Sequence, residues 1–506
     1  MIPAADRVRL IFGLKLRQLR QEKGLQINEL ADLAGFSPSY LNEIEKGKKY
    51  PKSEKIFALA RVLGTHYDNL VSVSLDKHLE PIEELLNSNI LGELPLEMFG
   101  IEPADLLRML SEAPSKVSAF ISTIIEISRN HGMNVEQFYF SALRSFQELH
   151  FNFFEEIEAE ANEFIKDHRP PDGVAFREDW LRNHLETEYG YRVETFNEAG
   201  RPELSGIRSV VLPGRAESGI PDLLLINENL EPKQRAFTYG REIGFCRMKL
   251  APRPYVSSQR EADSFDQVLN NFKASYFAGA ILVPRELLIS GLAVFFAKPV
   301  WSPAVLVEFM DTFEATPEIF MQRISNVMAR HFGIDQLFFL RFDHTTSSGS
   351  FKLAKEMHLA KLPFLHGTVN EHYCRRWASL SVLEDLALLQ QENRWDGEPL
   401  CQAQIAEYVD TANQYLVITL AKPSPPRKEY NSSITLGFAI NDRLKNLVRF
   451  LNDPALPHQQ VNETCERCRL PDCAKRARQP VLWEKQERNK ALREAVRLLS
   501  ETYLKA

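Results

Sequence analysis

The stretch QINELADLAGFSPSYLNEIEKG, residues 26–47, decides the fold of the N-terminal part of this chain. Its apolar residues recur at helical spacing on both sides of Gly35, which predicts two short helices separated by a turn. We expect the first helix over about 27–34. The second helix begins with Ser37 as its N-cap, has a proline in its first position and stops at the last glycine of the stretch. Two helices around a short glycine turn form the helix-turn-helix pattern.

Three further helices are expected around this pair, so that residues 8–72 form a five-helix bundle. The outer face of the second helix carries small polar side chains, which can hydrogen-bond base edges in the major groove. Basic side chains around it can hold the flanking phosphates, and Arg20 and Lys49 belong to this set. The side chains expected to contact double-stranded DNA are Gln26, Ser37, Ser39, Tyr40, Asn42, Lys46, Lys48 and Arg17. The alternative is a helical bundle that binds protein.

The charge of the chain is distributed unevenly. Its 506 residues include 61 Lys and Arg against 68 Asp and Glu, for a net charge of −7. Residues 6–57 alone hold eleven basic and seven acidic side chains, a net charge of +4, which leaves −11 for the remainder. Only the N-terminal segment is therefore electrostatically suited to a phosphate backbone.

Residues 16–64, LRQLRQEKGLQINELADLAGFSPSYLNEIEKGKKYPKSEKIFALARVLG, resemble the XRE family of lambda/434-repressor-like domains. The frame Gly-x-Ser-x-x-Tyr-Leu-x-x-Ile-Glu-x-Gly and the fourth helix agree together. Many members carry Gln as the second residue of the second helix, where this chain has Ile27 preceded by Gln26. The resemblance implies binding to two-fold operators as a homodimer. We place the dimer contact either in the region that follows or at the C-terminus.

The region at 73–168 has a helical pattern. In residues 134–168 apolar side chains recur mostly three and four residues apart, which predicts one long helix. The segment RPPDG, residues 169–173, ends it. Because the helix carries more apolar positions than one amphipathic face needs, it is either an internal core helix or a dimer spine.

Two segments in residues 169–300, QRAFTYGREIGFCRMKL (234–250) and NNFKASYFAGAILVPRELL (270–288), resemble the two helices of the ImmA/IrrE-type zinc peptidases. The family motif, His-Glu-x-x-His, places two imidazoles one helical turn apart to bind zinc. Here Arg241 and Phe245 occupy the histidine positions, whereas Glu242 keeps the general-base position. We therefore expect no catalytic residue and no proteolysis, and a salt bridge from Glu242 to Arg241 or another base.

Three cysteines lie within the nine residues CERCRLPDC, at 465–473. The first two can chelate one centre across a tight turn, and the third returns to it after a proline. Three thiols leave one ligand missing for a four-coordinate zinc or a cuboidal cluster. Cys401 is an alternative fourth ligand, and Cys246 is expected in the core. The expected metal ligands are Cys374, Cys465, Cys468 and Cys473.

The order of XRE domain, peptidase-like domain and C-x2-C-x4-C motif resembles the short-chain-fatty-acid regulators of the propionate/methylcitrate and glyoxylate pathways, over most of the chain. RFDHTTSSGSFKLAKEMHLAKL (341–362) followed by CRRW (374–377) is similar to that family's RxD…K…F…CPLW segment, with two arginines in place of Pro-Leu. CERCRLPDCAKRARQP (465–480) is similar to its cysteine tail motif, with Arg476 on the matching basic position. The resemblance implies an acyl-CoA effector and, in some members, a [4Fe-4S] cluster. CoA needs basic groups for its phosphates, and the candidates are Arg341, Lys352, Arg375 and Arg376.

These observations predict a multidomain α+β protein. We expect strands near 191–195, 209–212 and 222–226 in the peptidase-like part, and near 337–342, 415–421 and 434–440 in the C-terminal part. The last helix, from about 483, is a packing or dimer element. The expected domains are an all-α DNA-binding domain at 8–72, a helical linker or dimerisation region at 73–168, a degenerate peptidase-like domain at 169–300 and a C-terminal α/β sensor domain at 301–506.

The function that follows is a sequence-specific, DNA-binding transcriptional regulator, controlled by an acyl-CoA-type metabolite, a cysteine-ligated zinc or [4Fe-4S] cluster, or both. We expect it in the cytoplasm without membrane association, because the longest nearly uncharged apolar run, 287–297, is too short to cross a bilayer and no signal peptide is evident. One alternative is a redox-sensing iron–sulfur regulator without a small-molecule inducer. The other is a metalloprotease that cleaves a repressor.

Overall fold

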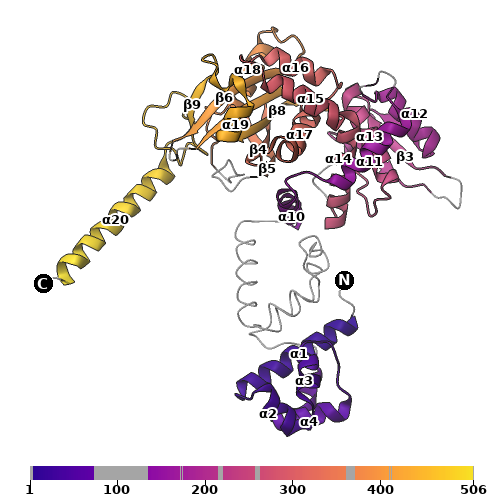
Figure 1. Cartoon of the computed structure of the whole chain (residues 1–506), viewed down its shortest axis with the longest axis vertical. Coiled ribbons are helices and arrows are strands. Elements are labelled where there is room, and N and C mark those ends of the chain that lie inside the picture. Colours follow the sequence, from indigo (N-terminus) through magenta and orange to yellow (C-terminus); the bar gives the residue numbers. More distant parts are fainter. Residues whose placement is uncertain are drawn as a thin grey trace. The chain divides into compact units, whose positions relative to one another are not determined.

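The structure, a computed structural model, describes residues 4–72 and 135–504, apart from 171–172, 174, 215–219, 257–261, 360–370, 410 and 412 (Figure 1). The chain divides into two compact units, residues 1–146 with 260–268 and residues 147–259 with 269–506. The first part of the expected helical linker, residues 73–134, lies outside the described residues.

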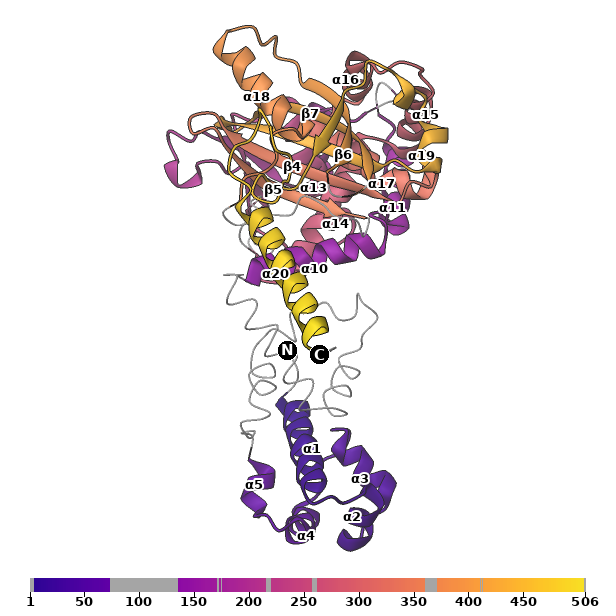
Figure 2. The same ribbon diagram turned by 90° about the vertical axis from the view of Figure 1, so that its left-hand side faces the viewer.

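Residues 4–72 form five helices, as predicted, around one apolar core (Figure 2). Helix α1 packs against α3 and α5, and α2 packs against α3 and α4. The core consists of buried aliphatic side chains from all five helices together with Phe12. The helices are α1 (Ala4–Glu22), α2 (Ile27–Ala34), α3 (Pro38–Glu45), α4 (Ser53–Leu63) and α5 (Tyr67–Val71).

The turn between α2 and α3 forms as its sequence predicts. Gly35 ends α2 in the left-handed conformation, with φ of 73°, which glycine adopts without steric cost. The Ser37 hydroxyl then accepts a hydrogen bond from the backbone N–H of Tyr40 at 3.3 Å and caps α3. Gln26 is the N-cap of α2 and forms a capping box with Glu29.

The prediction of a single long helix over residues 134–168 is wrong. The chain forms α10 (Val135–Leu149) and α11 (Glu155–His168), separated by a break in which Phe151 and Asn152 have φ of 51° and 53°. Asn152 is fully buried, and its amide donates to Ser325 at 3.1 Å and accepts from Gln147 at 3.0 Å. Those side-chain bonds stabilise the break, and Asn tolerates the left-handed region better than most residues.

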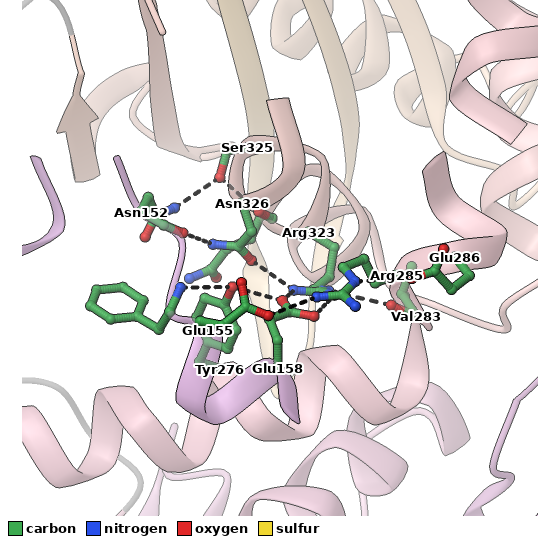
Figure 3. Close-up of polar contacts among 12 residues, drawn as sticks. Asn152, Glu155, Glu158, Tyr276, Val283, Arg285, Glu286, Arg323, Ser325 and Asn326 are labelled. Atoms are coloured by element: carbon green, nitrogen blue, oxygen red, sulfur yellow. Dashed lines mark hydrogen bonds and ion pairs between the residues drawn. The ribbon is translucent and has the colours of Figure 1, made fainter. Parts of the chain in front are cut away.

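A buried ion pair joins α11 to the helices that follow it (Figure 3). Arg323 Nη1 lies 2.6 Å from Glu158 Oε1, and both side chains are almost inaccessible. The Tyr276 hydroxyl donates to the same carboxylate at 2.7 Å, and Arg323 Nε donates to the carbonyl of Val283 at 3.3 Å. Burial raises the pKa of Glu158, but the guanidinium outweighs this and holds it below its usual value.

The peptidase-like part contains a three-stranded sheet with strand order β1-β3-β2. Strand β1 pairs parallel with β3, and β2 pairs antiparallel with β3. The three strands lie within one residue of their predicted positions. The elements are α12 (Glu178–Glu188), β1 (Arg192–Phe196), η2 (Pro202–Leu204), β2 (Ser209–Leu212), β3 (Leu223–Asn227), α13 (Pro232–Arg247), α14 (Phe265–Leu282) and α15 (Arg285–Phe296).

Helices α13 and α14 pack closely because glycine faces alanine at their contact. A Cβ on Gly244 would lie 3.0 Å from the Phe277 ring and 3.2 Å from the carbonyl of Ala274, and one on Gly240 would lie 3.3 Å from Ala278 Cβ. Gly244 therefore serves the packing of these two helices. In the described part of the chain no single helix is long and apolar enough to cross a membrane. Helices α14 and α15 reach that length and apolar character only when taken together, and their axes are bent by 66° relative to each other.

The C-terminal part is built on a six-stranded sheet of order β5-β4-β8-β7-β6-β9. Its pairings are antiparallel except for β6 with β9. The α/β arrangement expected from the sequence is therefore wrong, because the sheet is mainly antiparallel and three of its neighbouring pairs, β4–β5, β6–β7 and β7–β8, are hairpins. The strands are β4 (Leu337–Thr345), β5 (Ser350–His358), β6 (Leu400–Tyr408), β7 (Gln414–Ser424), β8 (Arg427–Ala439) and β9 (His458–Val461).

Helices cover both faces of this sheet. Helix α18 packs on one face, where Leu383 and Leu386 meet Phe342 and Val417. Side chains of α15, α16 and α17 meet Ile418 and other residues of the opposite face around a small apolar gap. The helices of this part are α16 (Pro303–Asp311), α17 (Pro317–Val327), η4 (Met328–Phe332), α18 (Ala378–Gln391), α19 (Asp442–Leu447), η5 (Arg449–Asn452) and α20 (Val481–Leu504).

Candidate DNA-binding surface and sensor sites

Helix α3 presents one polar face and buries the other. Leu41 and Ile44 are fully buried in the bundle core. Ser37 and Ser39 are exposed, whereas Tyr40 and Asn42 are half-buried at the edge of the same face. An eight-residue helix with short polar side chains outward has the dimensions that fit a major groove. The structure thus brings these four predicted contacts together.

Two residues to which the sequence analysis assigned no role hold α3 in place. Glu45, at the end of α3, accepts two hydrogen bonds from Arg20 of α1, at 2.7 and 2.9 Å. Gly13 of α1 lies against the same end of α3, since a Cβ there would be 2.4 Å from the carbonyl of Ile44. The prediction that Arg20 holds a DNA phosphate is corrected here, because its guanidinium is bonded to Glu45 inside the bundle. Sequence reasoning could have identified Gly13, because a glycine inside an apolar helix indicates close approach of another backbone.

Basic side chains surround α3. Lys48 is exposed, and Lys46 and Arg17 are half-buried. Lys55 lies over the Tyr40 ring with Nζ 4.1 Å from its centroid, and Lys49 pairs with Glu43 at 2.7 Å.

Gln26 is exposed at the start of α2. Its backbone N–H is bonded to the Glu29 carboxylate at 2.7 Å, so the residue stands outside the helix.

The peptidase-like site contains ion pairs where the family has zinc. Glu242 is fully buried, and Arg241 Nη2 lies 3.1 Å from its Oε1, which confirms the expected salt bridge. Arg253, which the sequence did not suggest, pairs with Glu242 Oε2 and lies over the Phe245 ring with its guanidinium carbon 4.3 Å from the centroid. Arg241 also donates to the Ser209 hydroxyl at 3.2 Å.

This arrangement lacks the groups that zinc hydrolysis needs. Neither a guanidinium at position 241 nor a phenyl ring at 245 can coordinate zinc. The carboxylate at 242 is neutralised by two cations, and its contact with Arg253 holds the pKa of that guanidinium above its usual value. The site is arranged as a structural ion cluster.

The four predicted cysteine ligands line one cavity near the end of the sheet. A bridge between Tyr373 and Thr464 brings the two cysteine segments side by side, and the N–H of Cys465 donates to the carbonyl of His372 at 2.8 Å. Trp377, almost fully buried, fixes the segment further by donating to the carbonyl of Asn462 at 2.8 Å. The lining consists of Cys374, Arg375, Arg376, Cys465, Cys468, Leu470, Cys473, Lys475 and Arg476.

The surroundings of the cavity suit thiolates. The backbone N–H of Ala477 donates to Cys465 Sγ at 3.3 Å, and such bonds accompany thiolate ligands. The basic side chains in the lining, among them Arg376 and Arg476, would complement the negative charge of thiolates in this cavity. Among the described residues no three His, Cys, Asp or Glu side chains have the arrangement of a formed metal site. Burial acts in the opposite direction, because it raises the pKa of the Cys374 thiol to about 11 and so disfavours its thiolate form.

The other two cysteines lie elsewhere. Cys401 is on β6, outside the cavity lining, and burial raises the pKa of its thiol to about 12. Cys246 is in α13, 3.7 Å from the Tyr191 hydroxyl, in the partly buried setting expected of a core thiol.

The four basic residues expected to bind an effector do not share one site. Arg341 is engaged by Glu318 at 2.7 Å. Lys352 is exposed on β5. Arg375 and Arg376 line the cysteine cavity, where Arg375 lies 4.0 Å from the Phe351 ring centroid. The register of β4 and β5 places Lys355, and not Lys352, opposite Arg341.

The bundle and the outer face of α3 define a helix-turn-helix DNA-binding domain. Residues 16–70 match the helix-turn-helix family, and residues 208–325 match the IrrE N-terminal-like domain of the M78 peptidases. The chain therefore carries an XRE-type helix-turn-helix domain and an ImmA/IrrE-like domain, which confirms both predictions. The exact domain limits stay predictions.

Several relatives are named transcriptional regulators. An uncharacterised HTH-type regulator of Bacillus subtilis, RghRB, is 41% identical over 64 residues, 12% of this chain and 46% of that protein. The y4dJ regulator of Sinorhizobium fredii is 35% identical over 65 residues, 13% of this chain and 84% of that protein. The propionyl-CoA carboxylase regulator of Cereibacter sphaeroides is 28% identical over 113 residues, 22% of this chain and 23% of that protein.

A solved Mycobacterium tuberculosis transcriptional regulator has a TM-score of 0.46 and 16% identity, covering 67% of this chain and 93% of the other.

Proposed function

We propose that this protein is a sequence-specific transcriptional regulator that binds double-stranded DNA through α3 and is controlled by its C-terminal part. The observation that carries the proposal is the exposed polar face of α3, held by the Arg20–Glu45 pair and flanked by Lys46 and Lys48. The match of residues 16–70 to the helix-turn-helix family and the regulator-named relatives support it. Its place of action is then the cytoplasm, where the DNA lies.

We propose further that the protein binds its operator as a homodimer, with α20 as a dimer element. The helix is exposed along nearly its whole length after Trp483 (Figure 1). Leu492, Val496, Leu499 and Tyr503 follow one another at steps of four, three and four residues, with exposed fractions of 63, 57, 59 and 82%. That spacing is the seam of a coiled coil.

The sensing part of the proposal has two components. Cys374, Cys465, Cys468 and Cys473 would hold a zinc ion or a [4Fe-4S] cluster, and their common cavity, its amide donor to sulfur and its basic lining support this. An acyl-CoA effector is supported by the partial similarity to the propionyl-CoA carboxylase regulator. The cavity equally favours the second candidate, a redox-sensing regulator in which the state of the thiols is itself the signal.

We do not propose a peptidase. Arg241 and Phe245 replace the two zinc ligands of the family, and the buried pairing of Glu242 with Arg241 and Arg253 leaves that carboxylate no access to a water nucleophile. The function proposed for this domain is to pack and to transmit a conformational state.

Selection of duplexes from a random library by the full-length protein tests the proposed function. A regulator of this kind enriches a two-fold symmetric motif, with half-sites spaced by about one helical turn, 10–10.5 base pairs, or a multiple of it. A protein-binding bundle would enrich no sequence over the starting library. Metal analysis of protein purified without oxygen tests the cysteine component separately.

A further inference from the structure

The break between α10 and α11 runs against the local sequence pattern. Residues 134–168 contain neither glycine nor proline, and their apolar side chains keep helical spacing across residues 150–154. Phe151 and Asn152 nevertheless have φ of 51° and 53°, in the left-handed region, which costs energy for most residues other than glycine. The Phe151 side chain is 49% exposed, so the packing of its ring offsets little of this cost. The break is therefore stabilised by other contacts.

Asn152 is the residue through which the break is held. It is fully buried, and its side-chain amide donates to Ser325 at 3.1 Å and accepts from Gln147 at 3.0 Å. Its backbone carbonyl accepts a hydrogen bond from the Asn326 side chain at 2.7 Å (Figure 3). In a continuous helix this carbonyl would instead accept from the N–H four residues further on, so the bond from Asn326 exists only in the broken form.

Helix α17, which carries both of these partners of Asn152, is also bonded to the C-terminal sheet. Glu318, near the start of the helix, pairs with Arg341 of β4 at 2.7 Å. One turn further along, Gln322 accepts a hydrogen bond from Lys355 of β5 at 3.2 Å. The position of α17 on the sheet therefore determines whether the partners of Asn152 reach the break.

We propose that residues 150–154 form a conformational switch, whose two states are this break and one continuous helix through α10 and α11, and that the bonds from α17 to Asn152 select the broken state. The local sequence pattern favours the continuous helix, whereas bonds between distant residues favour the break. A segment with two such packings is bistable, so a small shift of a neighbouring element changes which state it occupies.

The switch gives the C-terminal part a route to the DNA-binding domain. A shift of α17 on the sheet would remove the bonds that hold Asn152, and the segment would then become helical. Helix α10 would become an extension of α11, and α10 lies on the side of the break that leads along the chain to residues 4–72. This use of the switch in regulation rests on the proposed function, whereas the two states of residues 150–154 do not.

The test measures the distance between two nitroxide labels in the full-length protein. The labels are attached to ketone-bearing amino acids at Ser145 and Lys166, which are exposed positions on either side of the break, so that the native cysteines stay unlabelled. A continuous helix would hold the two Cα atoms about 32 Å apart, from its rise of about 1.5 Å per residue. Double electron–electron resonance gives the distance distribution, and thermal unfolding shows whether each variant is folded.

Asn152→Ala removes both side-chain bonds, so the ratio of continuous to broken form should rise at least about tenfold. Ser325→Ala removes one of these bonds and should raise the ratio less. Adding Phe151→Gly to Asn152→Ala should restore most of the broken form, because glycine adopts the left-handed region without steric cost and is a poor helix former. The control is Thr238→Ala, which removes a buried hydroxyl bonded within its own helix, α13, and should leave the distribution unchanged.

Wild-type distance distributions in both folded single variants, Asn152→Ala and Ser325→Ala, would overturn the switch, because the bonds from α17 would then not select the break. A larger continuous population after addition of Phe151→Gly would overturn it as well. If Asn152→Ala loses its thermal transition, Ser325→Ala decides, since it loses a single bond. The distances are measured without DNA, so a failure of the switch and a failure of the proposed function give different outcomes.

Discussion

Arg20 and Glu45 join α1 to the end of α3 through two parallel hydrogen bonds, from Nε to Oε1 at 2.7 Å and from Nη2 to Oε2 at 2.9 Å. Their side chains keep only 11 and 4% exposure. Because a bidentate pair fixes both planes, it sets the orientation of the helix that carries Ser39 and Asn42. The first prediction concerns this pair.

Glu45→Gln leaves the Arg20 guanidinium largely buried without its counter-charge. Breaking one side of a buried pair costs about 3 kcal/mol, and we expect the free energy of opening of α1–α5 to fall by that amount in hydrogen exchange. Glu43→Gln is the control, since the Glu43–Lys49 pair is exposed to solvent, where screening leaves it little effect on stability. Equal protection in the two variants would contradict the role assigned to Glu45.

The second prediction separates the two possible fourth ligands. Cys374→Ser removes a thiol that lines the cavity, so the amount of metal or cluster bound per chain should drop severalfold. Cys401→Ser, on β6, should bind as much as the wild type. Elemental analysis and visible absorption after anaerobic purification measure both, and the reverse order of the two variants would show that Cys401 is the ligand.

The third prediction concerns α20. Val496→Glu with Leu499→Glu places charge on the apolar seam, so the proposed dimer should become monomeric in sedimentation velocity. Arg497→Gln is the matched control, because Arg497 lies on the other side of the helix and pairs with Glu494 and Glu501. An unchanged dimer in the double variant would assign the dimer contact to another part of the chain.

The fourth prediction is an acid sensitivity that comes from His184. The ring is buried and stacked on Trp180 at 4.8 Å, and burial, the neighbouring His168 and Arg247 lower its pKa below 6.5. The folded state therefore favours the neutral ring, and its contribution to stability is complete above pH 6.5 and is lost as the pH falls below that value.

We expect the unfolding midpoint to fall between pH 7.5 and 5.5, and to fall less in His184→Phe, which keeps an aromatic ring on Trp180. His458→Gln, at an exposed position, should follow the wild type. A pH profile of His184→Phe identical to that of the wild type would rule out this histidine as the cause.

Local patterns in the sequence predicted what local forces determine. The cap at Ser37, the glycine turn, the three strands of the peptidase-like sheet and strands β4, β7 and β8 follow from short-range signals, whereas β5, β6 and β9 were not predicted. The bond between Glu242 and Arg241 follows from two adjacent charges with no metal ligands beside them. Cysteine spacing likewise led to the trio at 465–473.

The features that the sequence did not predict depend on contacts between residues far apart in the chain. The break after α10 depends on Asn152 bonding Ser325, 173 residues away, which no helical period can indicate. Arg253 reaches Glu242 from a loop after α13. Whether Lys352 or Lys355 meets Arg341 depends on strand register, which shifts by one residue between Arg341 and Phe342.

The most direct test of the central claim is the affinity of full-length protein for its selected duplex as a function of salt. If Asn42 reads bases as proposed, Asn42→Ala should weaken binding to that duplex by about 1–3 kcal/mol while leaving binding to random DNA unchanged. If Lys48 holds a phosphate as proposed, Lys48→Ala should weaken binding to both duplexes and reduce the salt slope by about 1. If both variants bound every duplex as the wild type does, with the same salt dependence, α3 would not be the DNA-reading helix and the account would be contradicted.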